Sequence, residues 1–134
     1  MMVLAMSEDG RSVMTKEIAE KQNLPATYLE QLMLTLRKAG LVLATRGAHG
    51  GYTLAKSANS VPLLEVVEAL EGPLDIADCA DVPNCCLDSD ACALKDIFEE
   101  ANNALVAVFQ NISLADLVDR QRGKESTSGE MYFI

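Results

Sequence analysis

All four cysteines of this 134-residue chain lie within the segment CADVPNCCLDSDAC, residues 79–92. Their spacing is Cys79-x5-Cys85 and Cys86-x5-Cys92, with Cys85 and Cys86 adjacent. Zinc sites usually contain closer C-x2-C pairs, whereas wider gaps suit a larger iron–sulfur cluster held by thiolates. Because adjacent side chains tend to diverge, we expect three ligands: Cys79, Cys92 and one of the central pair, with Cys85 preferred.

Three other interpretations of this segment stay open: a zinc site, a thiol–disulfide switch, or free cysteines in a loop. The cellular compartment helps to choose among these interpretations, because it sets whether thiols are reduced or form disulfides. The start of the chain, MMVLAMSEDG, lacks the cationic flank and cleavage site of a signal peptide. No apolar run approaches the roughly 20 residues that a membrane span requires. We therefore expect a cytoplasmic protein without membrane contact, whose thiols stay reduced.

The charge is distributed unevenly along the chain. The net charge is −9, but residues 1–60 carry seven Lys and Arg against five Asp and Glu. Residues 61–134 carry four against fifteen. A cationic surplus confined to the first half is compatible with nucleic-acid binding there, although the total charge is acidic.

The first half has the order of elements found in a winged helix-turn-helix. MTKEIAEKQN and TYLEQLMLTLRKAG are helical patterns separated by the break NLPA. Thr15 is placed to cap the first helix, and Thr27 and Glu30 have capping-box spacing in the second. Two β-prone runs, 41–45 and 52–55, then flank a glycine-rich tip and predict a hairpin.

In this fold the second helix enters the major groove, and the residues near its start reach base edges. The candidates for those contacts are Thr27, Tyr28, Glu30 and Gln31. At the hairpin tip, Arg46 beside Gly47 is a candidate for the minor groove. Phosphate contacts are assigned to Lys16, Arg37 and Lys38. Each residue also has a structural interpretation: Glu30 as a cap, Arg46 as a solvated charge, Tyr28 as a residue at the core edge.

The second half is expected to contain helices on either side of the cysteine segment. PLLEVVEALEG is amphipathic, and Ser113 with Asp116 predicts a capping box for the last helix. The apolar stripe between is too long for the core of a small domain, so we expect it to pack against a second subunit. The stripe consists of Leu94, Ile97, Phe98, Ala101, Leu105, Val108 and Ile112.

The predicted fold is mainly α with a small β-hairpin, a winged helix-turn-helix with a long C-terminal dimerisation helix. Residues 1–60 form its DNA-binding region, and residues 61–121 contain the cluster-binding loop and the dimerisation helices. Residues 122–134 are polar and are expected to be a disordered tail. An enzyme is a weak alternative, because the only histidine, His49, lies in the hairpin turn and no nucleophile–base pattern is visible.

Several of these motifs together resemble the Rrf-two family of bacterial regulators, in particular the IscR type. The motifs are YLEQLMLTLRKAGLV, RGAHGGYTLAK, EVVEALEGP, the cysteine loop and FQNISLADLV. The resemblance implies a homodimeric regulator of operator DNA that carries a [2Fe-2S] or [4Fe-4S] cluster. It places Tyr28, Glu30, Gln31 and Arg46 at DNA contacts, with Glu30 tuning the choice of site. It also places Cys79, Cys85 or Cys86, and Cys92 at cluster ligands.

Three features depart from that family pattern. Lys95 stands where IscR-type members have a histidine ligand, and one extra residue creates the Cys85–Cys86 pair. The family also normally has about a dozen residues before the point where this chain starts. The fourth ligand is therefore open among Cys86, Asp88, Asp90 and a group from that preceding segment.

The function expected from the sequence is an iron–sulfur-dependent regulator that senses cluster status, redox state or nitric oxide. One alternative is a winged-helix regulator without a cluster, which uses a thiol switch or a bound small ligand. The other is a zinc-stabilised interaction module.

Overall fold

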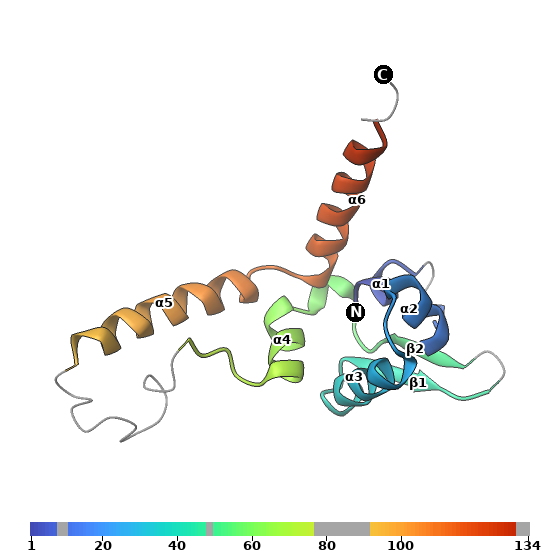
Figure 1. Ribbon diagram of the computed structural model, residues 1–134, viewed down its shortest axis with the longest axis horizontal. Coiled ribbons are helices and arrows are strands. Elements are labelled where there is room, and N and C mark those ends of the chain that lie inside the picture. The colour runs from blue at the N-terminus through green and yellow to red at the C-terminus, as the bar shows by residue number, and fades with distance from the viewer. Residues whose placement is uncertain (8–10, 48–49, 77–91, 131–134) are drawn as a thin grey trace.

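The structure is a computed structural model that describes residues 1–7, 11–47, 50–76 and 92–130. The described part is mostly helical with one two-stranded antiparallel sheet (Figure 1). The short helix α1 (Met2–Ala5) precedes a helix–turn–helix and a hairpin, and three further helices follow. This arrangement confirms the predicted fold class.

The helix–turn–helix consists of α2 (Thr15–Gln22) and α3 (Ala26–Lys38). Asn23 ends α2 in the left-handed conformation with φ 51°, which asparagine tolerates well. Pro25 then occupies the N-cap position of α3, so no side chain caps that helix. The predicted Thr27–Glu30 capping box is therefore wrong, because Thr27 lies inside the first turn. Thr15 is likewise the first helical residue and not the cap of α2.

The C-terminal end of α3 leads into the hairpin through a Schellman motif. Gly40 adopts φ +73°, and its N–H donates to the Arg37 carbonyl oxygen over 3.0 Å. The N–H of Leu41 donates to the Leu36 carbonyl oxygen, also over 3.0 Å. A glycine suits this position because it enters the left-handed region without a Cβ clash. The chain thus turns from α3 into the first strand.

The hairpin pairs β1 (Val42–Thr45) with β2 (Gly51–Leu54), in a register that sets Val42 opposite Leu54. Both strands lie within one residue of their predicted ranges. The sequence did not indicate a further bridge between Val13 and Tyr52, in which each residue donates its N–H to the other's carbonyl. Val13 thereby ties the start of the helix–turn–helix to the hairpin.

A single cluster of buried apolar side chains joins these elements to the second half of the chain. The 3-10 turn η2 (Ala58–Ser60) leads into α4 (Leu63–Glu71). Leu63 donates its N–H to Ile112 and Leu114 donates to Val61, both over 2.8 Å. This bridge draws Leu114 into the core, so the core includes residues from both sides of residue 60. Its members are Leu4, Val13, Ile18, Ala19, Leu29, Met33, Leu36, Leu41, Val42, Val61, Val66 and Leu114.

Two long helices, α5 (Ala93–Gln110) and α6 (Leu114–Glu130), extend from this body in different directions (Figure 1). The predicted capping box at the start of α6 is confirmed: the Ser113 hydroxyl and backbone N–H both donate to Asp116. The helix continues to Glu130, whereas the sequence predicts a disordered tail over residues 122–134. Gln121 donates to Glu125 over 2.9 Å in this stretch. No proline follows Ser113, and Gly123 and Gly129 are the two residues of this helix with the lowest helix propensity.

Candidate DNA interface and cysteine segment

The outer face of α3 presents the side chains predicted to reach base edges. Thr27, Tyr28, Glu30 and Gln31 are all exposed, and Tyr28 is 50% exposed. They are held outward because the opposite side of the same helix packs its apolar residues into the core. Those buried residues are Leu29, Met33 and Leu36. The half-exposed side chain of Tyr28 is compatible with both interpretations, a base contact and a residue at the core edge.

The hairpin tip presents Arg46, whose side chain is exposed, beside Gly47. Gly47 adopts φ +118°, a conformation that strains residues with a side chain. The N–H of Gly50 donates to the Gly47 carbonyl oxygen over 2.9 Å and closes the turn. His49 lies outside the described residues. The turn therefore holds a cationic side chain on a backbone that requires glycine.

The four cations proposed to contact DNA differ in their surroundings. Within the described ranges no ion pair engages Arg37, Lys38 or Arg46, whereas Lys16 lies 3.9 Å from Glu20. Arg37 and Lys38 occupy the last turn of α3, where the helix dipole favours positive charge. These side chains are available to phosphates without first breaking an intramolecular ion pair.

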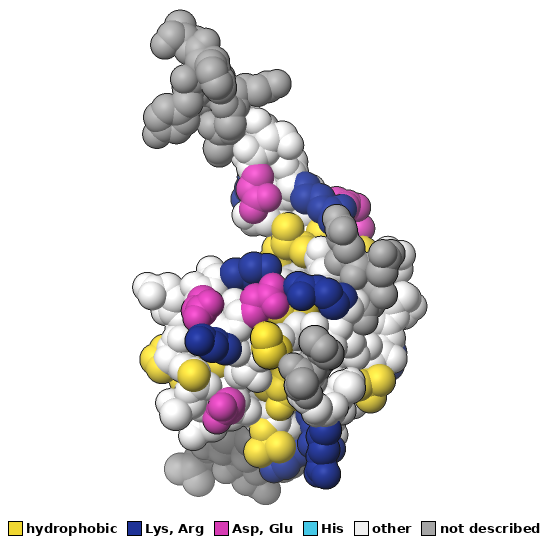
Figure 2. Space-filling model, turned by 90° about the vertical axis from the view of Figure 1, so that its right-hand side faces the viewer, with side chains coloured by type: hydrophobic (Ala, Val, Ile, Leu, Met, Phe, Trp, Pro, Cys, Tyr) yellow, Lys and Arg dark blue, Asp and Glu magenta, His cyan; other side chains and the backbone are white. Residues whose placement is uncertain are grey.

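The neighbouring surface carries charge of both signs. The Glu17 carboxylate accepts hydrogen bonds from Lys21 over 3.0 Å and from Arg11 over 3.1 Å. The Lys21 bond, followed by the Arg11 bond and the charges of both, lowers the pKa of the Glu17 carboxyl. Figure 2 shows Lys and Arg alternating with Asp and Glu on the face it displays. The side of the molecule shown there is the one on which α2 and the hairpin lie in Figure 1, and its charge is mixed and not uniformly basic.

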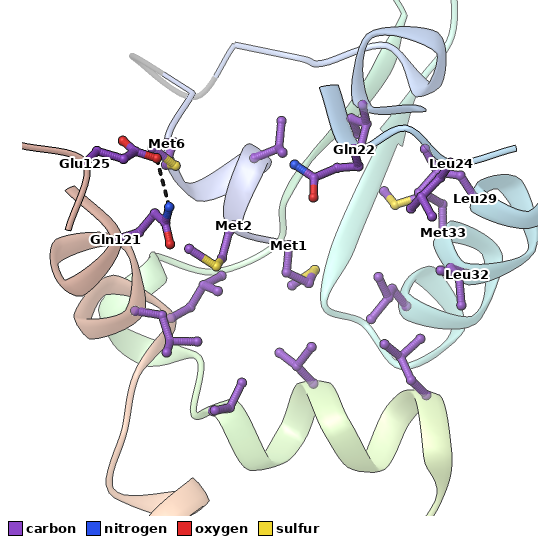
Figure 3. Close-up of a pocket in the computed structure, with 18 residues that line it drawn as sticks. Met1, Met2, Met6, Gln22, Leu24, Leu29, Leu32, Met33, Gln121 and Glu125 are labelled. Atoms are coloured by element: carbon purple, nitrogen blue, oxygen red, sulfur yellow. Dashed lines mark hydrogen bonds between the residues drawn. The ribbon is translucent and has the colours of Figure 1, made fainter. Parts of the chain in front are cut away.

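Behind α3 lies a cavity of about 530 Å³ that is bordered by α1, α2, α3, α4 and α6. Figure 3 shows methionine and leucine side chains around it, including Met1, Met2, Leu32 and Met33. The Gln121–Glu125 hydrogen bond lies at its edge. No sequence pattern indicated this cavity, because its lining comes from elements that meet only in the folded chain.

Of the four cysteines, only Cys92 falls within the described residues; Cys79, Cys85 and Cys86 lie outside them. Cys92 is the N-cap of α5, half-buried and not in a disulfide. Its carbonyl oxygen accepts a hydrogen bond from the Lys95 N–H over 3.1 Å. The described ranges contain no group of three or more His, Cys, Asp or Glu side chains that could hold a metal. Cys92 therefore joins the cysteine segment to the first turn of α5.

The predicted apolar stripe on α5 divides into two faces. One face is partly covered and includes Phe98, Leu105 and Ile112, the last just beyond the helix. The other is exposed, with Leu94 at 62%, Ile97 at 59% and Val108 at 56%. Ala101 and Ala104 complete the exposed face. Its spacing of three and four residues is that of a coiled-coil seam.

The fold and these surfaces define a winged helix-turn-helix transcription regulator. The profile of the Rrf2 (Rrf-two) family, described as iron-dependent transcriptional regulators, matches residues 1–120. This chain belongs to the Rrf2 family. Its relatives are regulators of transcription and not enzymes, and DNA binding is the shared activity of that family.

Two curated relatives give the level of similarity. The chain is 38% identical over 115 residues to protein rrf2 of Nitratidesulfovibrio vulgaris, covering 86% of this chain and 77% of that protein. It is 34% identical over 121 residues to the regulator IscR of Escherichia coli K12, covering 90% of this chain and 74% of that protein.

Two solved structures have the same fold. The B. subtilis global cysteine regulator CymR superposes with a TM-score of 0.73 at 29% identity, covering 89% of this chain and 87% of that one. IscR of T. potens gives a TM-score of 0.72 at 33% identity, covering 90% of this chain and 78% of that one. In the part of this chain that the structure describes, no helix is long and apolar enough to cross a membrane.

Proposed function

We propose that this chain is a cytoplasmic, homodimeric regulator that binds double-stranded operator DNA and adjusts that binding through an iron–sulfur cluster. Residues 1–60 present the reading helix and the hairpin, and residues 61–121 supply the cysteine segment and the dimerisation helix. The iron-dependent description of the family and the similarity to IscR support this proposal.

One structural relationship carries the proposal. Cys92 ends the cysteine segment and is at the same time the N-cap of α5, which bears the exposed apolar stripe. A change of ligation at Cys92 therefore acts directly on the first turn of the helix assigned to dimer contacts. Since paired half-sites require paired reading helices at a fixed spacing, a shift in the dimer alters operator affinity.

The ligands assigned to the cluster are Cys79, one of Cys85 and Cys86, and Cys92. A [2Fe-2S] or [4Fe-4S] cluster, when bound, supplies iron–thiolate chemistry that responds to redox state or nitric oxide. Lys95 does not serve as a fourth ligand, because a protonated amine has no lone pair to donate. The fourth position is left to Cys86, Asp88, Asp90 or a group from the segment that precedes this start in other family members.

The homodimer is assigned to the exposed face of α5. Leu94, Ile97 and Val108 recur at coiled-coil spacing, and the small residues Ala101 and Ala104 between them allow two helices to approach closely. Exposed apolar side chains in this number on one helix mark an interaction surface.

DNA contacts are assigned to α3 and the hairpin. Thr27, Tyr28, Glu30 and Gln31 read base edges in the major groove, where glutamine pairs with adenine and glutamate accepts from cytosine. Arg46, on the turn fixed by Gly47, enters the minor groove, and Arg37 contacts phosphate.

A second candidate is regulation by cysteine oxidation without a cluster. The similarity to CymR favours it, because one solved CymR structure, from Staphylococcus aureus, is of an oxidized form. A bound small ligand in place of a cluster belongs to the same alternative, and a zinc-stabilised interaction module is a third.

Anaerobic purification followed by an absorption spectrum and analysis of iron, sulfide and zinc separates these candidates. Brown protein with equal iron and sulfide supports the cluster, and the iron count per chain distinguishes its two types. Colourless protein with zinc, or with no metal after anaerobic reconstitution, contradicts the cluster proposal.

A further inference from the structure

One side chain on the outer face of α3 differs in chemistry from its neighbours. Leu34 is 48% exposed and lies on the same side of the helix as Thr27, Gln31 and Lys38. The other exposed residues of that face are polar or charged. Single exposed leucines are common on protein surfaces, but on the face assigned to the major groove this one offers an apolar contact to DNA.

The helical period fixes the direction of this side chain. Positions 27, 31, 34 and 38 recur at intervals of three and four residues and therefore share one face. The buried residues Leu29, Met33 and Leu36 occupy the opposite side. Leu34 thus follows Gln31 by one turn along the surface that faces away from the core.

We infer that Leu34 contacts the C5-methyl group of a thymine in the major groove of each operator half-site. The inference rests on the proposed DNA-binding function. The thymine methyl is the apolar group that base pairs display in the major groove, and apolar side chains recognise it. Gln31 on one side of Leu34 suits an adenine edge, and Lys38 on the other side suits a phosphate.

The charge around Leu34 favours DNA over a protein partner as its occupant. Arg37 and Lys38 flank it within one turn, and within the described ranges neither makes an ion pair. An apolar protein surface would have to accommodate two cations beside the leucine. The major groove of DNA offers a thymine methyl group to the leucine and phosphates to the two cations.

Replacing thymine by deoxyuridine removes only the methyl group and keeps the hydrogen-bonding edge. An operator is first selected from a random duplex library with the wild-type dimer. Each thymine is then replaced by deoxyuridine in both half-sites, and affinity is measured by fluorescence anisotropy. At one position the wild type is expected to lose about fourfold per half-site, the ratio that corresponds to exposing one methyl-sized group.

The Leu34→Ala variant is expected to bind the thymine and deoxyuridine duplexes at that position equally. The matched control, Leu43→Ala, changes another exposed leucine, on β1, and is expected to retain the wild-type discrimination. Thermal unfolding of both variants establishes that each is folded.

Two results overturn the inference. In one, the wild type binds the selected operator but does not distinguish thymine from deoxyuridine at any position. In the other, Leu34→Ala keeps the full discrimination, which assigns Leu34 to another partner. A wild-type dimer that selects no operator contradicts the proposed function itself, so the two failures are distinguishable.

Discussion

The Asp116 carboxylate accepts two hydrogen bonds from Ser113, one from its hydroxyl over 2.6 Å and one from its backbone N–H over 2.8 Å. Asp116 returns a bond from its own N–H to the Ser113 hydroxyl oxygen over 3.1 Å. The Ser113 hydroxyl bond is the main cause that lowers the pKa of the Asp116 carboxyl, followed by the bond from the Ser113 backbone. This cap fixes the start of α6 beside Leu114, a core residue.

A lowered pKa in the folded state makes the cap sensitive to acid. The carboxylate binds a proton less readily when folded than when unfolded, so its contribution is complete above the unfolded value, about 3.9. It is lost as the pH falls through the lower folded value. Asp116→Ala should therefore lower the melting temperature at pH 7, and this difference should shrink toward pH 3. A difference that is constant with pH would contradict the assignment.

Gly51 approaches the backbone of Val13 too closely for any side chain. A Cβ at position 51 would lie 2.4 Å from the Val13 carbonyl oxygen, below the closest separation that real contacts show. We expect Gly51→Ala to lower the free energy of unfolding by about 1–3 kcal/mol, the usual cost of overpacking. Chemical denaturation measures the change, and an unaltered midpoint would show that Val13 does not lie against the hairpin.

The same substitution at Gly123 should act in the opposite direction. A Cβ there would meet nothing within 4 Å, and the residue lies inside α6. Because glycine is less favourable than alanine in a helix by about 0.8–1.0 kcal/mol, Gly123→Ala should stabilise the protein by up to that amount. Denaturation under the conditions used for Gly51→Ala gives the comparison. No change would favour the disordered tail predicted from the sequence.

The role of the exposed α5 stripe in dimerisation can be tested by placing an aspartate on each of two faces of the helix. Ile97→Asp puts a charge into the proposed seam, and we expect it to convert the dimer to a monomer. The matched control, Asn103→Asp, puts the same residue on the side of α5 away from the stripe and should leave the dimer intact. Sedimentation velocity measures both. A monomeric wild type, or a dimeric Ile97→Asp variant, would contradict the assignment.

Local patterns predicted the elements well, because period and turn chemistry act over a few residues. The helix–turn–helix, the hairpin and the Ser113–Asp116 cap all follow from such signals. The predicted cap at Thr27 was wrong, because Pro25 is the N-cap and α3 begins two residues earlier than a cap at Thr27 would require. The pairing of Val13 with Tyr52 joins residues far apart in sequence and has no local signal.

The sequence predicted some features of the candidate sites and missed others. Exposure of Thr27, Glu30 and Gln31 follows from the apolar period on the other side of α3. The sequence presented the α5 stripe as one surface, because helical spacing alone does not tell which apolar residues pack within the chain. Phe98 and Leu105 are partly covered, while Leu94 and Ile97 stay exposed. The cavity behind α3 is formed where five helices meet, and no local sequence pattern indicates it.

The central claim is that a cluster at the cysteine segment controls operator binding. Its most direct test is operator affinity at fixed salt, with the cluster assembled anaerobically and after its removal by a chelator, for the wild type and for Cys92→Ala. Salt must be held constant because phosphate contacts make affinity depend steeply on it. The account predicts a change of about tenfold or more for the wild type, within the usual range of allosteric coupling. It predicts no change for Cys92→Ala, and equal wild-type affinities with and without the cluster would contradict it.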